Sequence, residues 1–318
     1  PGIHRANWRG RMSMDKVTIN MPKQAFKSFS AGRVWTLATN TVTQLLRMRI
    51  LWFLLAFSVL VVAAGFAFPA MSPEQQLKLL KDVSFGALQV FSVVIAISAT
   101  ALLLPRDIED RTLYTILSKP VPRYEYLIGK LLGVLVLIGG GLLFMDAIFS
   151  GVVWLKQSMI IRDNIAAYER EQSATPEIIA AVRTQIEHYG LNGSLHAGVW
   201  AVFLKAAVIS ALALLVSCFA SSTLFTIVIT FAMTIIGHGE QLMRDWFFHK
   251  HLSTFWEKTM SAAIAILCPD LGAFDLVEPA IRGDVISSGA LLSVTGLAAL
   301  YITGYTTVAY LFFVEKEL

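Results

Sequence analysis

Charged residues are scarce in this chain, at 15% of its 318 residues, whereas a typical soluble domain has about 25%. The low fraction argues against a water-soluble globular domain, and the 56% of hydrophobic residues indicates a membrane protein. Only two cysteines occur, without a C-x-x-C pair, so neither a disulfide framework nor a cysteine zinc site is predicted. The phosphate-binding pattern G-x-x-x-x-G-K-[ST] is also absent, which predicts no nucleotide site of this kind within the chain.

The sequence contains six long apolar runs. A membrane-spanning helix needs about 20 apolar residues, and five runs reach that length while a sixth, at 223–237, is marginal. The runs are 50–70, 83–104, 131–155, 197–220, 223–237 and 285–314. Backbone groups in hydrocarbon need partners within their own segment, so we expect helices. The sequence predicts an all-α membrane protein, with a six-span domain over 50–318 preceded by a basic segment over 1–49.

Lysine and arginine predict how the spans are oriented. The segments 1–49 and 105–130 and the C-terminal residues hold fifteen basic residues, against ten in 71–82, 156–196 and 238–284. Basic loops stay in the cytoplasm, so we expect both termini there and the other three loops outside. The segment 1–49 has two interpretations that stay open: a solvated orientation signal, or an interfacial helix on anionic lipid that includes Val34 and Arg33.

The polar segment 105–130, PRDIEDRTLYTILSKPVPRYEYLIGK, lies between two predicted spans. Asp107 and Asp110 are candidate N-caps of a short helix. Pro120 ends that helix, and Pro122 suits the first turn of the next one. The pattern favours a helix, a tight corner and a span that reaches into the cytoplasm. From these features alone, an ordinary loop with turn prolines is an equally good interpretation.

The order of residues in this segment resembles the cytoplasmic signature of type-2 ABC exporter permeases, R-E-I-E-x-G-T-L-x-x-L-L-S-x-P-[VI]-x-R-x-x-[FY]-L-x-G-K. Asp107 replaces the usual Glu, and Arg111 stands where Gly is common. The matching residues are Arg106, Ile108, Glu109, Thr112, Leu113, Leu117, Ser118, Pro120, Val121, Arg123, Tyr126, Leu127, Gly129 and Lys130. The resemblance covers about 25 residues, and the six-span layout agrees with it over the rest of the chain.

The resemblance implies a coupling helix over 109–117 that docks into a separate ATP-binding cassette subunit. The docking residues that it implies are Arg106, Asp107, Glu109, Arg111, Thr112, Leu113, Leu117, Pro120 and Arg123. ATP and Mg would bind two copies of that partner, beside a second permease copy or a homologous one, in the inner membrane of a prokaryote. The chain itself is expected to be no enzyme and to hold no cofactor; membrane lipid is an expected partner and nucleic acid is not.

Two outer loops invite further predictions. The region 238–284 is rich in aromatics, and the resemblance implies re-entrant helices over roughly 241–268, although an interfacial helix pair without a gating role stays open. The loop 156–196 is polar, with a helix start at Thr175-Pro176-Glu177. We expect a small external helical hairpin there, either a variable insertion or a contact for a partner.

Two charges fall inside predicted spans. Asp146 lies about nine residues from the outer end of the third span, and Lys205 about eight from the outer end of the fourth. Charges in lipid are costly and pair or face a cavity, so we expect an ion pair between them; a place on the substrate path is the alternative. His249 and His251 are weak evidence for a metal, so none is predicted.

Three function classes remain on these residues. The first is an exporter permease, and the second is the membrane module of an ATP-driven machine that extracts or remodels without net transport. The third, an enzyme with its site in the bilayer, needs clustered catalytic groups at one depth, where only Asp146 and Lys205 are found.

Overall fold

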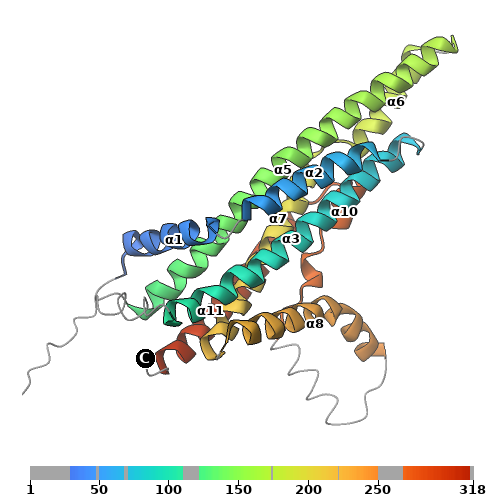
Figure 1. Cartoon of the computed structure of the whole chain (residues 1–318). Helices are drawn as coiled ribbons and strands as arrows, with labels where there is room; N and C mark the ends of the chain where they lie inside the picture. Colours follow the sequence, from blue (N-terminus) through green and yellow to red (C-terminus); the bar gives the residue numbers. More distant parts are fainter. Residues whose placement is uncertain are drawn as a thin grey trace, which may run out of the picture.

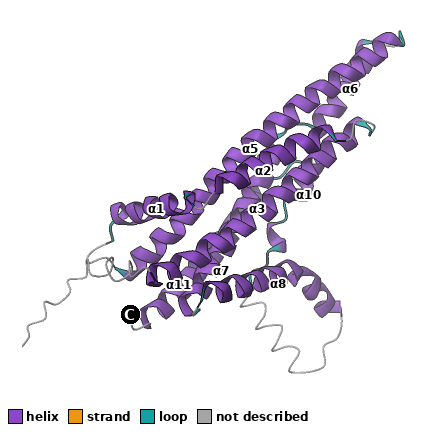
Figure 2. Ribbon diagram, viewed as in Figure 1, coloured by secondary structure: helices purple, strands orange, loops and turns teal. Residues whose placement is uncertain are grey.

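The structure is a computed structural model that describes residues 29–47, 50–67, 71–109, 122–172, 175–220, 222–249 and 268–315. Within these ranges the regular structure is helical and no strand occurs (Figure 2). The helices are α1 (Ala31–Leu46), α2 (Ile50–Phe66), α3 (Pro73–Glu109), α5 (Arg123–Arg170), α6 (Pro176–Tyr189), α7 (Gly193–Phe219), α8 (Thr223–His249), η1 (Gly272–Phe274), α10 (Val277–Arg282) and α11 (Ser288–Glu315).

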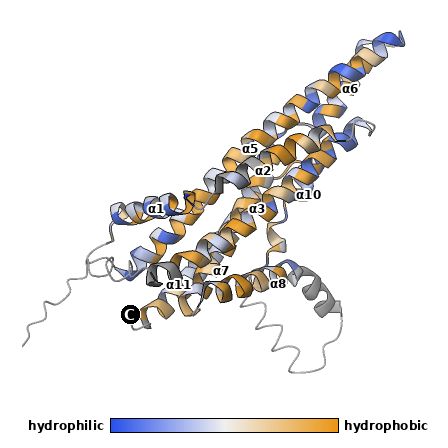
Figure 3. Cartoon of the chain, viewed as in Figure 1, coloured by the Kyte–Doolittle hydropathy of each residue, from blue (hydrophilic) through white to orange (hydrophobic). Residues whose placement is uncertain are grey.

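Four helical segments are long and apolar enough to cross a membrane: Pro73–Leu103, Arg123–Arg170, Pro176–Phe219 and Ser288–Val314. These features are consistent with the predicted helical membrane protein. Figure 3 shows the same character, with hydrophobic residues along the middle of the bundle and hydrophilic ones gathered at the free end of α5 and α6. Helix α2 and the apolar part of α8, Thr223–Gly239, have 17 residues each, about 26 Å at the helical rise.

Helix α7 is the centre of the bundle. It packs against α3, α5, α8, α10 and α11, and most of its residues are buried. Alanine, glycine and serine recur along it and let neighbouring helices approach closely. At Gly198 a Cβ atom would lie 2.9 Å from the Phe85 ring of α3. Phe85 in turn packs edge-on against Phe149 of α5, at 5.4 Å between ring centroids.

The predicted external loop 156–196 is largely helical. No proline or glycine interrupts the chain after Leu155 until Gly190 except Pro176, so α5 runs for 48 residues, about 72 Å. After a short turn α6 returns along it, and the two project from the bundle (Figure 1). The predicted helix start is confirmed, since the Thr175 hydroxyl accepts a hydrogen bond from the Ile178 amide at 3.3 Å. Ile160 and Ile186 pack with Leu77 at the base of this projection.

Helix α8 corrects the short run predicted at 223–237. It continues through Gly237 and Gly239 to His249, because no proline interrupts it and glycine, although unfavourable, does not end a helix as proline does. The chain returns to Gly237 after residue 268: the Leu271 amide donates to its carbonyl at 3.1 Å. Of the predicted re-entrant segment 241–268, residues 241–249 belong to α8, and 250–267 lie outside the described residues.

Candidate functional site

The predicted docking segment connects α3 to α5. Arg106, Asp107 and Glu109 belong to the last turns of α3, where the structure describes the helix and not the side chains. Arg111, Thr112, Leu113, Leu117 and Pro120 lie outside the described residues. The described structure resumes at Pro122, the N-cap of α5. The candidate site is therefore defined by the first turns of α5 and by the helices that they contact.

Arg123, the first residue of α5, fastens this helix to the end of α11. Its Nη1 donates to the carbonyl oxygens of Phe313 and Val314, each at 3.0 Å, and its guanidinium carbon lies 5.9 Å from the Phe313 ring centroid. The last carbonyls of a helix have no partner within it and carry partial negative charge. Arg123 satisfies two of them, so this predicted docking residue also has a structural role within the chain.

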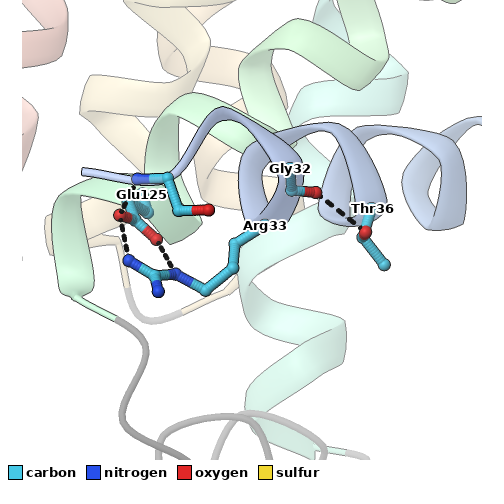
Figure 4. A network of polar contacts seen from close by, with 5 residues as sticks. Gly32, Arg33, Thr36 and Glu125 are labelled. Atoms are coloured by element: carbon cyan, nitrogen blue, oxygen red, sulfur yellow. Dashed lines mark hydrogen bonds and ion pairs between the residues drawn. The ribbon is translucent and has the colours of Figure 1, made fainter. Parts of the chain in front are cut away.

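Glu125, in the first turn of α5, binds the start of α1. Its carboxylate is fully buried and accepts from Arg33 Nε at 2.6 Å and Arg33 Nη2 at 2.7 Å. The Ser30 amide donates to it at 2.9 Å. Figure 4 shows the Arg33 side chain pointing at both oxygens. Bidentate arginine–carboxylate pairs are among the strongest hydrogen bonds in proteins, and the pairing raises the pKa of Arg33 above its usual value.

The carboxylate of Glu125 also stabilises α1 as a helix. Ser30 is the N-cap of α1, yet its own side chain makes no capping bond. A carboxylate at a helix N-terminus interacts favourably with the free amides and with the helix dipole. Glu125 supplies that group from another helix, so α1 depends on α5 for its N-terminal cap. Within α1, the Thr36 hydroxyl donates to the Gly32 carbonyl at 2.9 Å (Figure 4).

Two glycines let α1 cross α5 in close contact. A Cβ atom on Gly129 would lie 2.7 Å from Leu37 Cβ, and one on Gly133 would lie 2.8 Å from the Ala38 carbonyl oxygen. Both distances are shorter than side chains tolerate, so any larger residue would force the helices apart. The small-xxx-small spacing, weak as a sequence signal, marks a helix crossing here.

Aromatic rings extend this contact to α11. Tyr124 stacks on Phe29 at 6.4 Å between centroids and meets Tyr310 edge-on at 6.3 Å. Tyr126, fully buried, stacks on Phe313 at 5.8 Å. We call this assembly the junction; it consists of Phe29, Ser30, Arg33, residues 123–133, Tyr310 and Phe313. It fixes the start of α5, directly after the predicted docking segment, to α1 and α11.

The predicted ion pair between Asp146 and Lys205 is wrong. Asp146 Oδ2 instead contacts His196 Nδ1 at 2.8 Å. Helix α5 continues well past Leu155, and α6 and a turn precede α7. His196 rather than Lys205 therefore lies at the level of Asp146. Lys205 consequently lies about nine residues, or 13 Å, from the level of Asp146. Lys205 itself is buried.

Sequence reasoning missed three charged residues. Arg33 and Glu125 are 92 positions apart, and no local signal in the sequence joins them. Lys81 was assigned to an outer loop, but its side chain is fully buried in α3. Its Nζ has no hydrogen-bond partner among the described residues. No signal in the sequence separates it from an exposed lysine such as Lys78.

The described residues contain no group of three or more His, Cys, Asp or Glu side chains arranged to hold a metal ion. Compared with models of known families and with curated proteins, the chain finds no match in either set. The junction is therefore interpreted on its own geometry and on the resemblance of the adjoining segment.

Proposed function

We propose that this chain is the permease subunit of a type-2 ABC exporter. In this proposal α2, α3, α5, α7, α8 and α11 cross a prokaryotic inner membrane, with both termini in the cytoplasm. The segment 109–117 docks into a separate cassette subunit, which binds ATP and Mg. Two cassette subunits and a second permease copy, identical or homologous, complete the transporter.

The junction is the observation that carries the proposal. A segment that receives force from a partner needs a stiff connection to the spans that it moves. Here the residues directly after the segment bind α1 through Glu125 and α11 through Arg123. A flexible loop between two spans has no need of a partly buried ion pair at its base. The junction therefore favours a docking element over an ordinary loop.

Helix α5 provides the path for the motion. It begins at the junction and continues unbroken for 48 residues to the far end of the molecule. When the cassette subunits close on ATP, displacement of 109–117 shifts the start of α5 together with α1 and the end of α11. Close packing of α5 against α7 then carries the shift into the bundle core. Contact alone does not establish coupling, so the proposal needs a functional test.

The test reverses charges in the docking segment of the full-length chain. Glu109→Lys combined with Arg111→Glu leaves the net charge unchanged but inverts the local pattern. The matched control, Glu177→Lys with Arg183→Glu, makes the same change on exposed positions of α6. Each protein is affinity-purified from its native membranes in mild detergent, and the retained ATPase is quantified by mass spectrometry and by ATP hydrolysis.

We expect the segment variant to retain about tenfold less ATPase than wild type or more, since inverted charges at an interface repel the partner. The control should retain all of it. Wild-type ATPase retention and hydrolysis in the segment variant would refute the docking role. If an intact complex hydrolyses ATP in vesicles without moving any species across, the remodelling machine replaces the exporter.

A further inference from the structure

An apolar groove of about 480 Å³ lies between α2 and α3. Ala56, Phe57 and Leu60 form its α2 wall, and its α3 wall extends from Val83 to Ile95 through Gly86 and Val90. All of its lining residues, among those that the structure describes, are apolar. Nearer the turn between the helices the two are close: a Cβ atom on Gly65 would lie 3.8 Å from Leu80 Cδ1. The groove opens where this contact ends.

The position of the groove restricts its occupant to something apolar. Its α3 wall belongs to the candidate span Pro73–Leu103. Val90, 66% exposed, and Val94, 46% exposed, border the groove on the outside of the bundle, as does Leu60 of α2. A span is surrounded by lipid or by other spans, so the groove faces one of these two.

The dimensions of the groove discriminate between lipid and another span as its occupant. Twelve helical steps along α3 cover about 18 Å, which gives the groove a cross-section of about 27 Å² for its volume. A helix with side chains is about 10 to 12 Å across and does not fit. A partner helix would therefore reach into the groove with single side chains and leave most of its length empty. An extended methylene chain, about 4 Å wide at carbon contact distance, does fit.

We infer that the α2–α3 groove binds one acyl chain of a membrane phospholipid. The bound chain fills the groove between the two helices, and it becomes part of the surface that the bundle presents to the bilayer. Binding requires neither an ATPase nor a second copy, so the inference stands apart from the proposed function.

Gly86 makes the inference testable, because a Cβ atom there would have no atom within 4 Å. Phenylalanine at this position enters the groove without displacing the helices. Gly86→Ala adds one carbon and leaves the groove open. Gly296→Phe in α11 is the matched control, since a Cβ atom at Gly296 also meets nothing within 4 Å.

The experiment is native mass spectrometry of the full-length proteins, delipidated in detergent and then titrated with palmitoyl-oleoyl phosphatidylethanolamine. We expect wild type, Gly86→Ala and Gly296→Phe to bind one lipid more tightly than the rest. Gly86→Phe should weaken that first binding at least about tenfold, because displacing two buried methylene groups suffices for this loss.

Two results would overturn the inference. The first is lipid binding by Gly86→Phe that equals wild type, or no preferred lipid on wild type. The second is rapid disulfide formation between copies of Gly86→Cys in oxidised native membranes, which would put a second copy at the groove. Both native cysteines are buried, so a disulfide dimer would report on position 86.

Discussion

The buried polar groups of the junction are hydrogen-bonded, whereas most of the unpartnered ones among the described residues lie toward α6. At the junction, Glu125 has three donors on its carboxylate and Arg123 satisfies two helix carbonyls. Toward α6, several buried polar atoms have no hydrogen-bond partner among the described residues. They are Lys81 Nζ, Asp146 Oδ1, Ser150 Oγ and Asn192 Oδ1; two others, Thr100 Oγ1 in the second half of α3 and Thr230 Oγ1 in α8, lie away from this end.

This difference has an energetic meaning. A satisfied, close-packed contact is lost when either partner changes, whereas a buried polar group without a partner lowers stability while it is present. The junction end should therefore be damaged by substitution, and the α6 end should tolerate or benefit from it. In the proposed permease, the rigid end would be the one that receives force from the partner.

The largest effect is expected from Gly133→Leu. A Cβ atom at this position would already lie 2.6 Å from Thr41 Cβ and 2.8 Å from the Ala38 carbonyl oxygen, so α1 must move away from α5. We expect the free energy of unfolding to fall by about 3 kcal/mol, measured by denaturant titration in mild detergent.

Gly151→Leu is the control for Gly133→Leu on the same helix, because a Cβ atom there meets nothing within 4 Å. Replacement of glycine by leucine raises helix propensity equally in both variants. The difference between their free energies of unfolding therefore measures the effect on the α1–α5 contact alone. Equal stability of the two would mean that α1 does not rest on α5 through these glycines.

A smaller effect is expected when the ion pair is broken. Arg33→Met leaves the buried Glu125 carboxylate with the Ser30 amide as its remaining protein donor among those described. We expect amides of α1 to exchange with solvent about tenfold faster or more, since a charge-assisted pair holds the helix in place. Hydrogen exchange with mass spectrometry reads this directly, with α6 as the internal reference.

Arg33→Lys tests whether the bidentate geometry matters, because lysine keeps the charge but presents a single point donor group. In Arg33→Lys, the rate of amide hydrogen exchange in α1 should lie between the rates in wild type and in Arg33→Met. The double variant Arg33→Met with Glu125→Leu removes both charges, and it should be more stable than Arg33→Met alone. If it is less stable, the pair is not the reason that α1 stays docked.

At the α6 end the sign should reverse. Lys81→Met keeps the length of the side chain and removes an ammonium group that is fully buried without a hydrogen-bond partner among the described residues. We expect the free energy of unfolding to rise by about 1–3 kcal/mol. Lys78→Met, at an exposed position on the same helix, should change it little. Loss of stability in Lys81→Met would show that Nζ has a partner in the membrane.

The sequence predicts local structure in this chain better than it predicts contacts between helices. Local signals worked: apolar runs predicted helices, and Thr175-Pro176 marked the start of α6, because caps and prolines act within one turn. Pairings failed where they depend on helix register. Asp146 was assigned to Lys205 because α5 was expected to stop near Leu155, and the partner is His196. Glu125 and Arg33 were not paired because nothing local joins residues 92 positions apart.

The smallest effect is expected at the tip of the projection formed by α5 and α6. Thr175→Ala removes the hydroxyl that caps the Ile178 amide and should cost about 1 kcal/mol. The loss stays local, as faster amide exchange in the first turn of α6, because the projection is tied to the bundle further down by Ile160 and Ile186. Thr184→Ala is the matched control within α6. The Thr184 hydroxyl donates to the Ala180 carbonyl of the preceding turn. Loss of this bond should be offset by the higher helix propensity of alanine, so we expect no change in stability. If Thr175→Ala lowered the stability of the whole chain as much as Gly133→Leu, the α6 end would be as tightly coupled as the junction, and the contrast between the two ends would not hold.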